Sequence, residues 1–165
     1  ILLDRKNFFL EMKNSLITNF LSSALFACDR GDKPPALETL PIIKTITGEK
    51  IDFNHLKRTW VVINYWANWC EPCKKEIPEL NAFSESHDNV YLIGVNYDGL
   101  DNHHLTEVIA QNNIHYFNSM VDPSASLGIG DIPGLPVTFI FNQEGKLTKT
   151  LFGPQTKQSL AKAIS

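Results

Sequence analysis

Residues 60–78 read WVVINYWANWCEPCKKEIP, and this stretch decides how the chain is expected to fold. Its first part, residues 60–67, is apolar, β-branched and aromatic, as is typical of a strand buried on both faces of a sheet. Residues 74–86 are compatible with a helix. The pattern therefore places Cys70 at a helix N-terminus, where unpaired backbone N–H groups and the positive end of the helix dipole favour a thiolate over a thiol.

Cys73 lies one helical turn beyond Cys70 and can reach back to it. This arrangement favours thiol–disulfide exchange, in which Cys70 attacks a substrate disulfide and Cys73 resolves the mixed disulfide. The alternative is half of a zinc site, which needs a second Cys or Cys/His pair at ligand spacing. The histidines offer no such pair, since His103 and His104 are adjacent and the others are scattered. We therefore predict no metal and no cofactor.

Residues 66–78, with the string Cys-Glu-Pro-Cys-Lys-Lys-Glu, resemble the active-site segment of thioredoxin-fold proteins, most closely the TlpA/ResA-like branch of bacterial, membrane-tethered thiol–disulfide oxidoreductases. The resemblance covers residues 37–165. It implies an α/β thioredoxin fold with a mixed central sheet flanked by helices and an added N-terminal β-hairpin. It also places a kinking proline at Pro78, inside the active-site helix.

A second matching segment, residues 132–141, resembles the cis-proline loop of that family and the hairpin after it. By this resemblance the Leu135–Pro136 bond is cis, packs against the disulfide, and lets the backbone of Leu135 pair with an extended client peptide. Pro133 is the competing proline in the same loop, and an ordinary proline-rich turn is the alternative. Client contacts are expected from five residues: Trp69, Glu71, Pro72, Leu135 and Pro136. Trp66 is expected in the core.

Two glutamates near the cysteines, Glu76 and Glu71, are assigned different roles. Classical thioredoxins carry a buried aspartate where this chain has Asn64, which cannot accept a proton, so Glu76, three residues after Cys73, is predicted to manage proton transfer. Glu76 as a solvated surface residue is the alternative. Glu71 lies between the cysteines, where its charge opposes a thiolate at Cys70 and so favours a reductant over an oxidant.

The N-terminal residues indicate an address outside the cytosol. A basic start at Met12-Lys13 and an apolar stretch ending in Ala27-Cys28 resemble a bacterial lipoprotein signal, with Cys28 as the lipidated residue. A plain N-terminal anchor, or a secretory signal that leaves Cys28 free, is the alternative. We predict an upstream extension and signal over residues 1–27, a polar, proline-rich tether over residues 28–36, and one thioredoxin-like domain over residues 37–165. Asp29 resembles the signal that retains lipoproteins in the inner membrane, which predicts the periplasmic side of that membrane.

The predicted function is an extracytoplasmic reductant of protein disulfides, such as those of apocytochrome c in cytochrome c maturation. An exposed dithiol in an oxidising space accumulates as a disulfide unless it is reduced, so a membrane electron donor of the DsbD/CcdA type is implied. The alternatives are a general disulfide oxidase or isomerase, and a copper-binding metallochaperone that uses both thiols. The net charge of −3, with no basic run, argues against nucleic-acid binding.

The remaining chain is assigned from periodicity and turn signals. Predicted strands are a hairpin over 42–53, then 61–65, 90–96, 137–141 and 147–152. Predicted helices are the active-site helix to Ser86, one after Asp101 with Ile114 on its apolar face, a short helix near Ser124, and residues 155–164.

Overall fold

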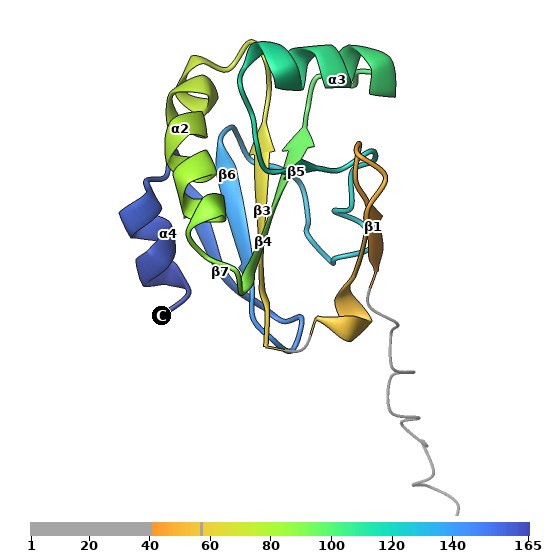
Figure 1. Ribbon diagram of the computed structural model, residues 1–165. Coiled ribbons are helices and arrows are strands. Elements are labelled where there is room, and N and C mark those ends of the chain that lie inside the picture. The colour runs from red at the N-terminus through yellow and green to blue at the C-terminus, as the bar shows by residue number, and fades with distance from the viewer. Residues whose placement is uncertain (1–40, 57) are drawn as a thin grey trace, which may run out of the picture. The chain divides into compact units, whose positions relative to one another are not determined.

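The computed structural model describes residues 41–56 and 58–165. The predicted signal, Cys28, the tether and the first residues of the predicted domain lie outside the described residues. A five-stranded sheet in the order β5-β4-β3-β6-β7 forms the centre of the fold (Figure 1). Its strands are β3 (Trp60–Trp66), β4 (Val90–Asn96), β5 (Phe117–Asn118), β6 (Val137–Phe141) and β7 (Leu147–Phe152).

The central strand β3 pairs in parallel with β4 and antiparallel with β6. Its residues from Val61 to Trp66 are all buried, which explains the unbroken apolar sequence of this strand. β5 runs parallel to β4, and β7 runs antiparallel to β6. The carboxyl ends of β3, β4, β5 and β7 therefore meet the amino end of β6 at one edge of the sheet, which we call the active-site edge.

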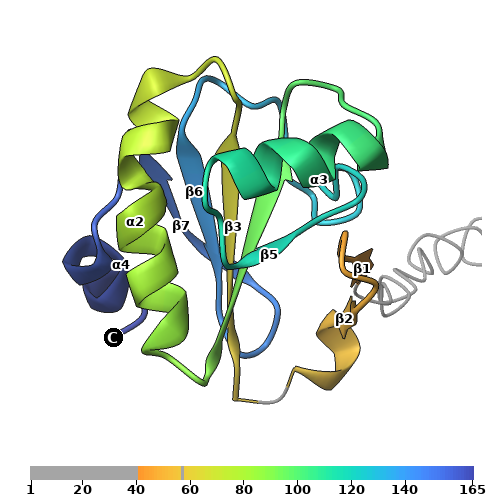
Figure 2. The same ribbon diagram turned by 45° about the horizontal axis from the view of Figure 1, so that its top comes forward.

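Helices α2 (Glu71–Glu85) and α4 (Lys157–Ala163) pack on one face of the sheet, and α3 (Asn102–Gln111) crosses near the carboxyl ends of β3 and β4 (Figures 1 and 2). One buried cluster joins Val62, Leu92 and Ile140 of the sheet to residues of all three helices. Side chains cap the N-termini of α3 and α4. Asp101 accepts the N–H of His104, and Thr156 forms a capping box with Ser159. Pro78 lies inside α2, as predicted.

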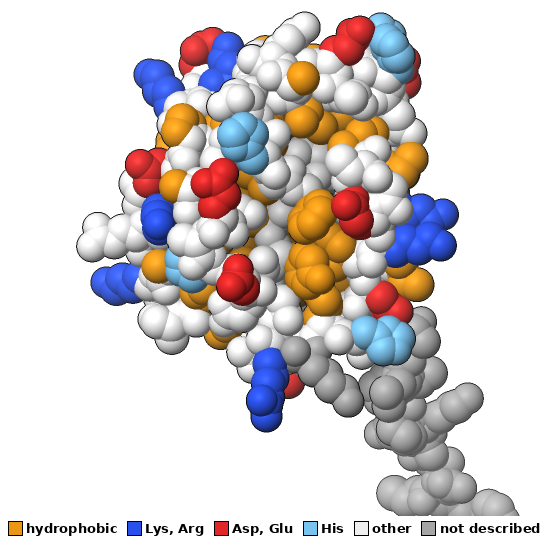
Figure 3. All heavy atoms as spheres, in the orientation of Figure 1, with side chains coloured by type: hydrophobic (Ala, Val, Ile, Leu, Met, Phe, Trp, Pro, Cys, Tyr) orange, Lys and Arg blue, Asp and Glu red, His pale blue; other side chains and the backbone are white. Residues whose placement is uncertain are grey.

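The other face is covered by the N-terminal hairpin of β1 (Ile42–Lys44) and β2 (Lys50–Asp52) and by the short helix after it, η1 (Phe53–His55). Ile43, Ile51 and Phe53 are buried in a second cluster with Ile63 and Phe139 of the sheet. In Figure 3, hydrophobic side chains gather at the centre of one face, between α2 and this hairpin. The predicted mixed sheet, flanking helices and N-terminal hairpin are thus confirmed.

Two local predictions were wrong, and one strand was not predicted. Residues 124–128 form a hydrogen-bonded turn rather than a short helix, with Gly128 at a φ of 64°. α3 ends at Gln111, so Ile114 is buried outside the helix, and Asn113 at a φ of 55° turns the chain away. The sequence reading also missed β5, a strand of 2 residues that adds a parallel edge to the sheet.

One glycine allows the sheet to be crossed by a side-chain hydrogen bond. The indole Nε1–H of Trp66 on β3 reaches over β4 and donates to Asn118 Oδ1 on β5, 3.0 Å away. Gly94 lies on β4 directly beneath that bond, and a Cβ there would meet Asn118 Oδ1 at 2.4 Å. Only glycine leaves room for this bond. The bond holds Trp66 next to residues 67–70, the segment between β3 and α2 that we call the active-site loop.

Candidate active site

Cys70 and Cys73 form a disulfide at the start of α2, with their Cα atoms 5.3 Å apart. Cys70 is the N-cap residue of α2, and its sulfur accepts the backbone N–H of Cys73 at 3.3 Å. The predicted place of Cys70 at a helix N-terminus is therefore confirmed. Cys70 is 4% exposed and Cys73 is 0% exposed. Both residues are buried, and Cys70 is the more exposed of the two.

Glu71 and Pro72 in the first turn are exposed, and Lys74 is half-buried. Lys74 forms an ion pair with Glu71, and this contact holds the pKa of Glu71 below its usual value. Glu71 is therefore ionised at neutral pH, beside the cysteine that is predicted to act as a thiolate. Its paired lysine weakens, but does not reverse, the repulsion expected from the sequence.

Glu76 is buried in the interior, with only 2% of its surface exposed. Its Oε1 accepts the side-chain N–H of Asn64 at 2.8 Å, and its Oε2 accepts the backbone N–H of Gln155 at 2.7 Å. Burial raises the pKa of Glu76 to about 7, and these two hydrogen bonds only partly oppose the rise. Glu76 is therefore not a solvated surface residue. A carboxyl group with this pKa can release and take up a proton near neutral pH.

The amide of Asn64 orients that carboxyl group. Besides Glu76, Asn64 Nδ2 donates to the hydroxyl of Thr138 at 3.1 Å, so the amide bridges β6 and α2. An aspartate at this position would bring a second acceptor against Glu76, whereas asparagine supplies a donor. Burial raises the pKa of the Tyr116 phenol, and the nearby charge of Glu76 raises it further.

Sequence reasoning missed Thr138 and Gln155. Thr138 sits in the apolar run of β6, two residues after Pro136, where it reads as a β-branched strand residue. Gln155 contributes through its backbone N–H, and a backbone donor leaves no mark in the sequence. The missing proton acceptor at Asn64 was the one signal that pointed to this network.

The Leu135–Pro136 peptide bond is cis, as the resemblance predicted, and Pro133 does not carry the cis bond. Pro136 O accepts the N–H of Gly153 at 3.0 Å, which ties this loop to the end of β7. Leu135 is half-buried and packs against both hydrophobic clusters. The loop thus enters the active-site edge where β6 begins.

The two tryptophans around the motif have different surroundings. Trp66 is 1% exposed and belongs to the cluster that contains both cysteines. Trp69 is 68% exposed, immediately before Cys70. Trp66 is thus a core residue, and the indole of Trp69 is open to an approaching molecule.

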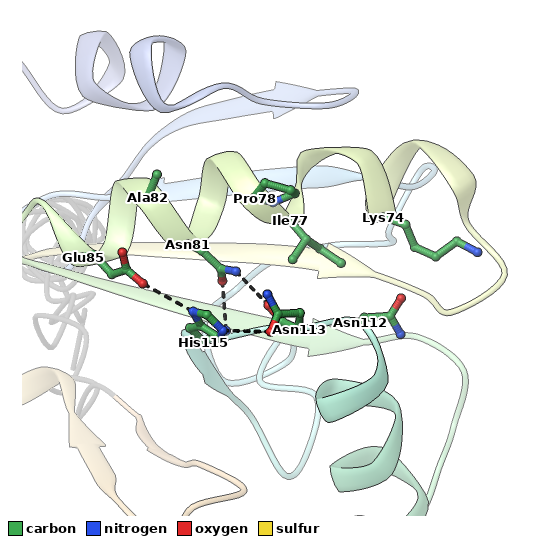
Figure 4. Close-up of a pocket in the computed structure, with 9 residues that line it drawn as sticks. All are labelled: Lys74, Ile77, Pro78, Asn81, Ala82, Glu85, Asn112, Asn113 and His115. Carbon is green, nitrogen blue, oxygen red and sulfur yellow. Dashed lines mark hydrogen bonds and ion pairs between the residues drawn. The ribbon is translucent and has the colours of Figure 1, made fainter.

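A pocket of about 330 Å³ extends from Lys74 along α2 to the connection between α3 and β5 (Figure 4). Asn81 donates to Asn113 O and accepts the N–H of His115, and His115 also contacts Glu85. These bonds join α2 to that connection, and they engage the side chains of Asn81, Glu85 and His115. Within residues 41–56 and 58–165, no group of three or more His, Cys, Asp or Glu side chains could hold a metal ion.

Comparisons with known proteins place this site in a family. A model of the AhpC/TSA family matches residues 31–150. The chain belongs to this family. It is 32% identical over 138 residues to the sporulation thiol-disulfide oxidoreductase A of Bacillus subtilis, covering 81% of this chain and 83% of the relative. It is 28% identical to the thiol-disulfide oxidoreductase ResA of Bacillus cereus, covering 72% of this chain and 69% of the relative.

The crystal structure of StoA from Bacillus subtilis matches the fold with a TM-score of 0.63 and 30% identity, covering 78% of this chain and 98% of that one. These matches confirm the predicted resemblance and the thioredoxin fold. The AhpC/TSA family member described here is therefore a thiol–disulfide oxidoreductase. Protein substrates that carry thiols or disulfides follow from that chemistry.

Proposed function

We propose that this protein is an extracytoplasmic reductant of disulfides in client proteins such as apocytochrome c, with Cys70 and Cys73 as the reacting pair. The observation that carries the proposal is the order of three groups along α2. Cys70 caps the helix and is 4% exposed, Cys73 is 0% exposed, and Glu76 follows one turn later with its pKa raised to about 7.

The reaction starts from the reduced pair. The Cys70 thiolate attacks one sulfur of the client disulfide, forms a mixed disulfide and releases the other client sulfur as a thiolate, which takes a proton from water. Cys73 then loses its proton and attacks Cys70 Sγ, which closes the Cys70–Cys73 disulfide and releases the second client thiolate. Two electrons pass from the protein dithiol to the client.

Glu76 receives the proton of Cys73 in the second step. Side chains three residues apart on a helix are neighbours, with Cβ atoms roughly 5–6 Å apart. Both Cys73 and Glu76 are buried, so bulk water is a poor acceptor for that proton. A carboxylate with a pKa of about 7 can accept it and later return it to solvent.

The client is held at the active-site edge. The backbone of Leu135, beside the cis bond to Pro136, pairs with an extended client segment. Trp69, Glu71 and Pro72 contact the client on the other side of the disulfide. The support is their exposure beside Cys70, above all the open indole of Trp69.

The cellular setting rests on residues outside the described part of the chain. Residues 1–27 act as the signal, Cys28 is lipidated, residues 28–36 tether the domain, and residues 37–165 form it. The domain faces the periplasm from the inner membrane, where a donor of the DsbD/CcdA type reduces it. Among the described residues, no helix is long and apolar enough to cross a membrane.

The reduction potential of the Cys70–Cys73 pair tests the direction of electron flow. We expect a value well below the roughly −120 mV of the strongest disulfide oxidants. Equilibration with glutathione buffers, followed by thiol trapping, measures it. The reduced protein is also expected to reduce a disulfide-bonded apocytochrome c peptide. A potential near that of the strong oxidants, with oxidation of the reduced peptide, would instead establish an oxidase.

A further inference from the structure

The exposed large hydrophobic side chains are concentrated at the active-site edge. Ile42, at the start of β1, and Leu147, at the start of β7, lie elsewhere. The others follow the carboxyl ends of strands at the edge that carries the disulfide: Trp69 after β3, Tyr97 and Leu100 after β4, Met120 and Val121 after β5, and Phe152 at the end of β7. Grouped apolar exposure of this kind marks interaction surfaces on soluble proteins.

Part of this edge is hollowed. A cavity of about 230 Å³ lies between the connection from β4 to α3 and the segment after β5. Buried Val95 and Leu105 contribute to its lining, and Leu100, Met120 and Val121 are its exposed apolar residues. The cavity is smaller than the roughly 300–1,000 Å³ of pockets for whole small molecules, and it suits a single side chain.

The side chains left free in the lining are mainly apolar, because the polar ones are already hydrogen-bonded. Asn96 Nδ2 donates to Asp98 Oδ2 at 2.7 Å, and Ser119 Oγ donates to Val121 O at 2.6 Å. Asp122 is the one charged residue that lines the cavity, and its Oδ1 already accepts the hydroxyl of Tyr65 at 2.6 Å and the N–H of Ser124 at 2.8 Å. Met120 adds a flexible, polarisable wall that adapts to side chains of different shape. No basic side chain lines the cavity, which disfavours an anionic ligand.

Hydrogen bonds hold the cavity in a fixed position relative to the disulfide. The N–H of Tyr97 donates to Trp66 O at 2.8 Å. Asp98 Oδ2 accepts the N–H of Asn68 at 2.8 Å and the side chain of Asn96 at 2.7 Å, which locks the connection after β4 onto the active-site loop. On the opposite wall, the bond from Tyr65 to Asp122 anchors the segment after β5 to β3.

From this geometry we infer that the cavity is a second docking site for the client, which takes one apolar side chain of an extended segment whose cysteine reacts at Cys70. This inference rests on the proposed function. The cavity lies at the ends of β4 and β5, one to two strand spacings, about 5–10 Å, from β3. An extended chain advances about 3.3 Å per residue. The anchoring side chain therefore lies roughly two or three residues from the client cysteine.

Peptides with a single cysteine, each joined to glutathione as a mixed disulfide, test the inference. One series carries leucine at two to seven residues from the cysteine, and the control peptide carries serine there. The reduced full-length protein is expected to react about tenfold faster when leucine stands roughly two or three residues away, because the apolar side chain is buried. Val121→Asp is expected to remove this preference, and Leu100→Ala to reduce it.

The matched control is Ile42→Asp, which places the same charge on an exposed apolar residue away from the active-site edge. It is expected to keep the preference. All variants are expected to reduce glutathione disulfide at the rate of the unmodified protein, since that small substrate does not reach the cavity. Equal rates with leucine and serine peptides would overturn the docking site and leave the proposed function intact. Failure to reduce any disulfide would overturn both.

Cross-linking from a photoreactive phenylalanine at position 121 identifies the occupant directly. Cross-links to the leucine peptide, reduced by excess unlabelled peptide, support the inference. Cross-links mainly to a second copy of the chain, or to its own residues 1–40, with no competition by the peptide, would overturn it.

Discussion

Among the single residues of the site, Glu76 is a buried acid whose pKa is shifted in opposite directions by burial and by hydrogen bonds. Burial favours its protonated form, while the N–H groups of Gln155 and Asn64 favour the carboxylate. The balance leaves its pKa at about 7, so the protonated and ionised forms of Glu76 are close in free energy near neutral pH. Such a residue can exchange a proton with little cost, which is what resolution by a buried Cys73 requires.

The raised pKa of Glu76 makes stability depend on pH. The folded pKa of about 7 lies above the ordinary glutamate pKa of 4.5, so the folded state binds more protons between these values. The free energy of unfolding therefore falls as pH rises from 4.5 through about 7, by about 3 kcal/mol. Glu76→Gln is expected to remove this decrease. Urea unfolding of the oxidised protein at pH 5 and pH 8 measures it.

The comparison uses the change between the two pH values rather than absolute stability, because glutamine places an N–H against one of the two donors and is destabilising at both. Glu85→Gln, an exposed substitution on the same helix, is the control. If Glu76→Gln loses stability between pH 5 and pH 8 as steeply as the unmodified protein, the raised pKa is wrong.

Some of these residues could be predicted and others could not. Cys70, Cys73 and Pro136 stand in long motifs, and Glu76 followed from the absence of an acidic residue at Asn64. The hydrogen bonds from Gln155 and to Thr138 come from segments 79 and 74 residues away from their partners. Contacts of that sequence separation depend on tertiary packing, which local patterns do not contain.

At the scale of elements, the sheet is held near the site by the bond from Trp66 to Asn118 across Gly94. Gly94→Ala is expected to lower the free energy of unfolding by about 2–4 kcal/mol, because the new methyl group displaces Asn118 and leaves buried polar groups unpaired. Chemical denaturation at constant pH measures the loss.

Gly130→Ala is the matched control, since a Cβ there meets nothing within 4 Å and Gly130 has no positive φ. We expect it to change stability by less than about 1 kcal/mol. Equal effects of the two substitutions would show that the close approach at Gly94 is not what limits this position.

Long elements were predictable because their periodicity is strong, and the short strands of the N-terminal hairpin followed from the family resemblance, but two other short segments were not predicted correctly. β3, β4, β6 and β7 were found close to their observed bounds. β5 has only 2 residues, and it is a strand because β4 pairs with it. The region near Ser124 reads as a short helix, yet it closes as a turn at Gly128.

At the scale of the whole molecule, parallel strand ends bring the disulfide, the cis-proline loop and most exposed large hydrophobic side chains to one edge of the sheet. This convergence could not be derived from separate motifs, because it depends on strand order. The membrane tether is a proposal that rests on the sequence of residues outside the described part of the chain. Under the proposed function, the active-site edge determines how a client reaches the sulfurs of Cys70 and Cys73, and the tether determines how the electron donor reaches them.

Cys28→Ser tests the tether. If Cys28 is lipidated, the substitution is expected to abolish the added lipid mass and prevent lipoprotein-type cleavage before residue 28. Intact-mass measurement of protein extracted from a bacterial host checks both. A cleaved, membrane-bound Cys28→Ser protein with the same mass difference would contradict lipidation and support a different processing route.

The most direct test of the whole account is a trapping measurement with a peptide that contains one disulfide. Reduced Cys73→Ala protein is mixed with the oxidised peptide, and intact mass spectrometry with peptide mapping locates any adduct. The account predicts a stable mixed disulfide on Cys70, and much slower adduct formation by Cys70→Ala protein. An adduct that forms equally fast on Cys73 in the Cys70→Ala protein, or no adduct in either variant, would contradict it.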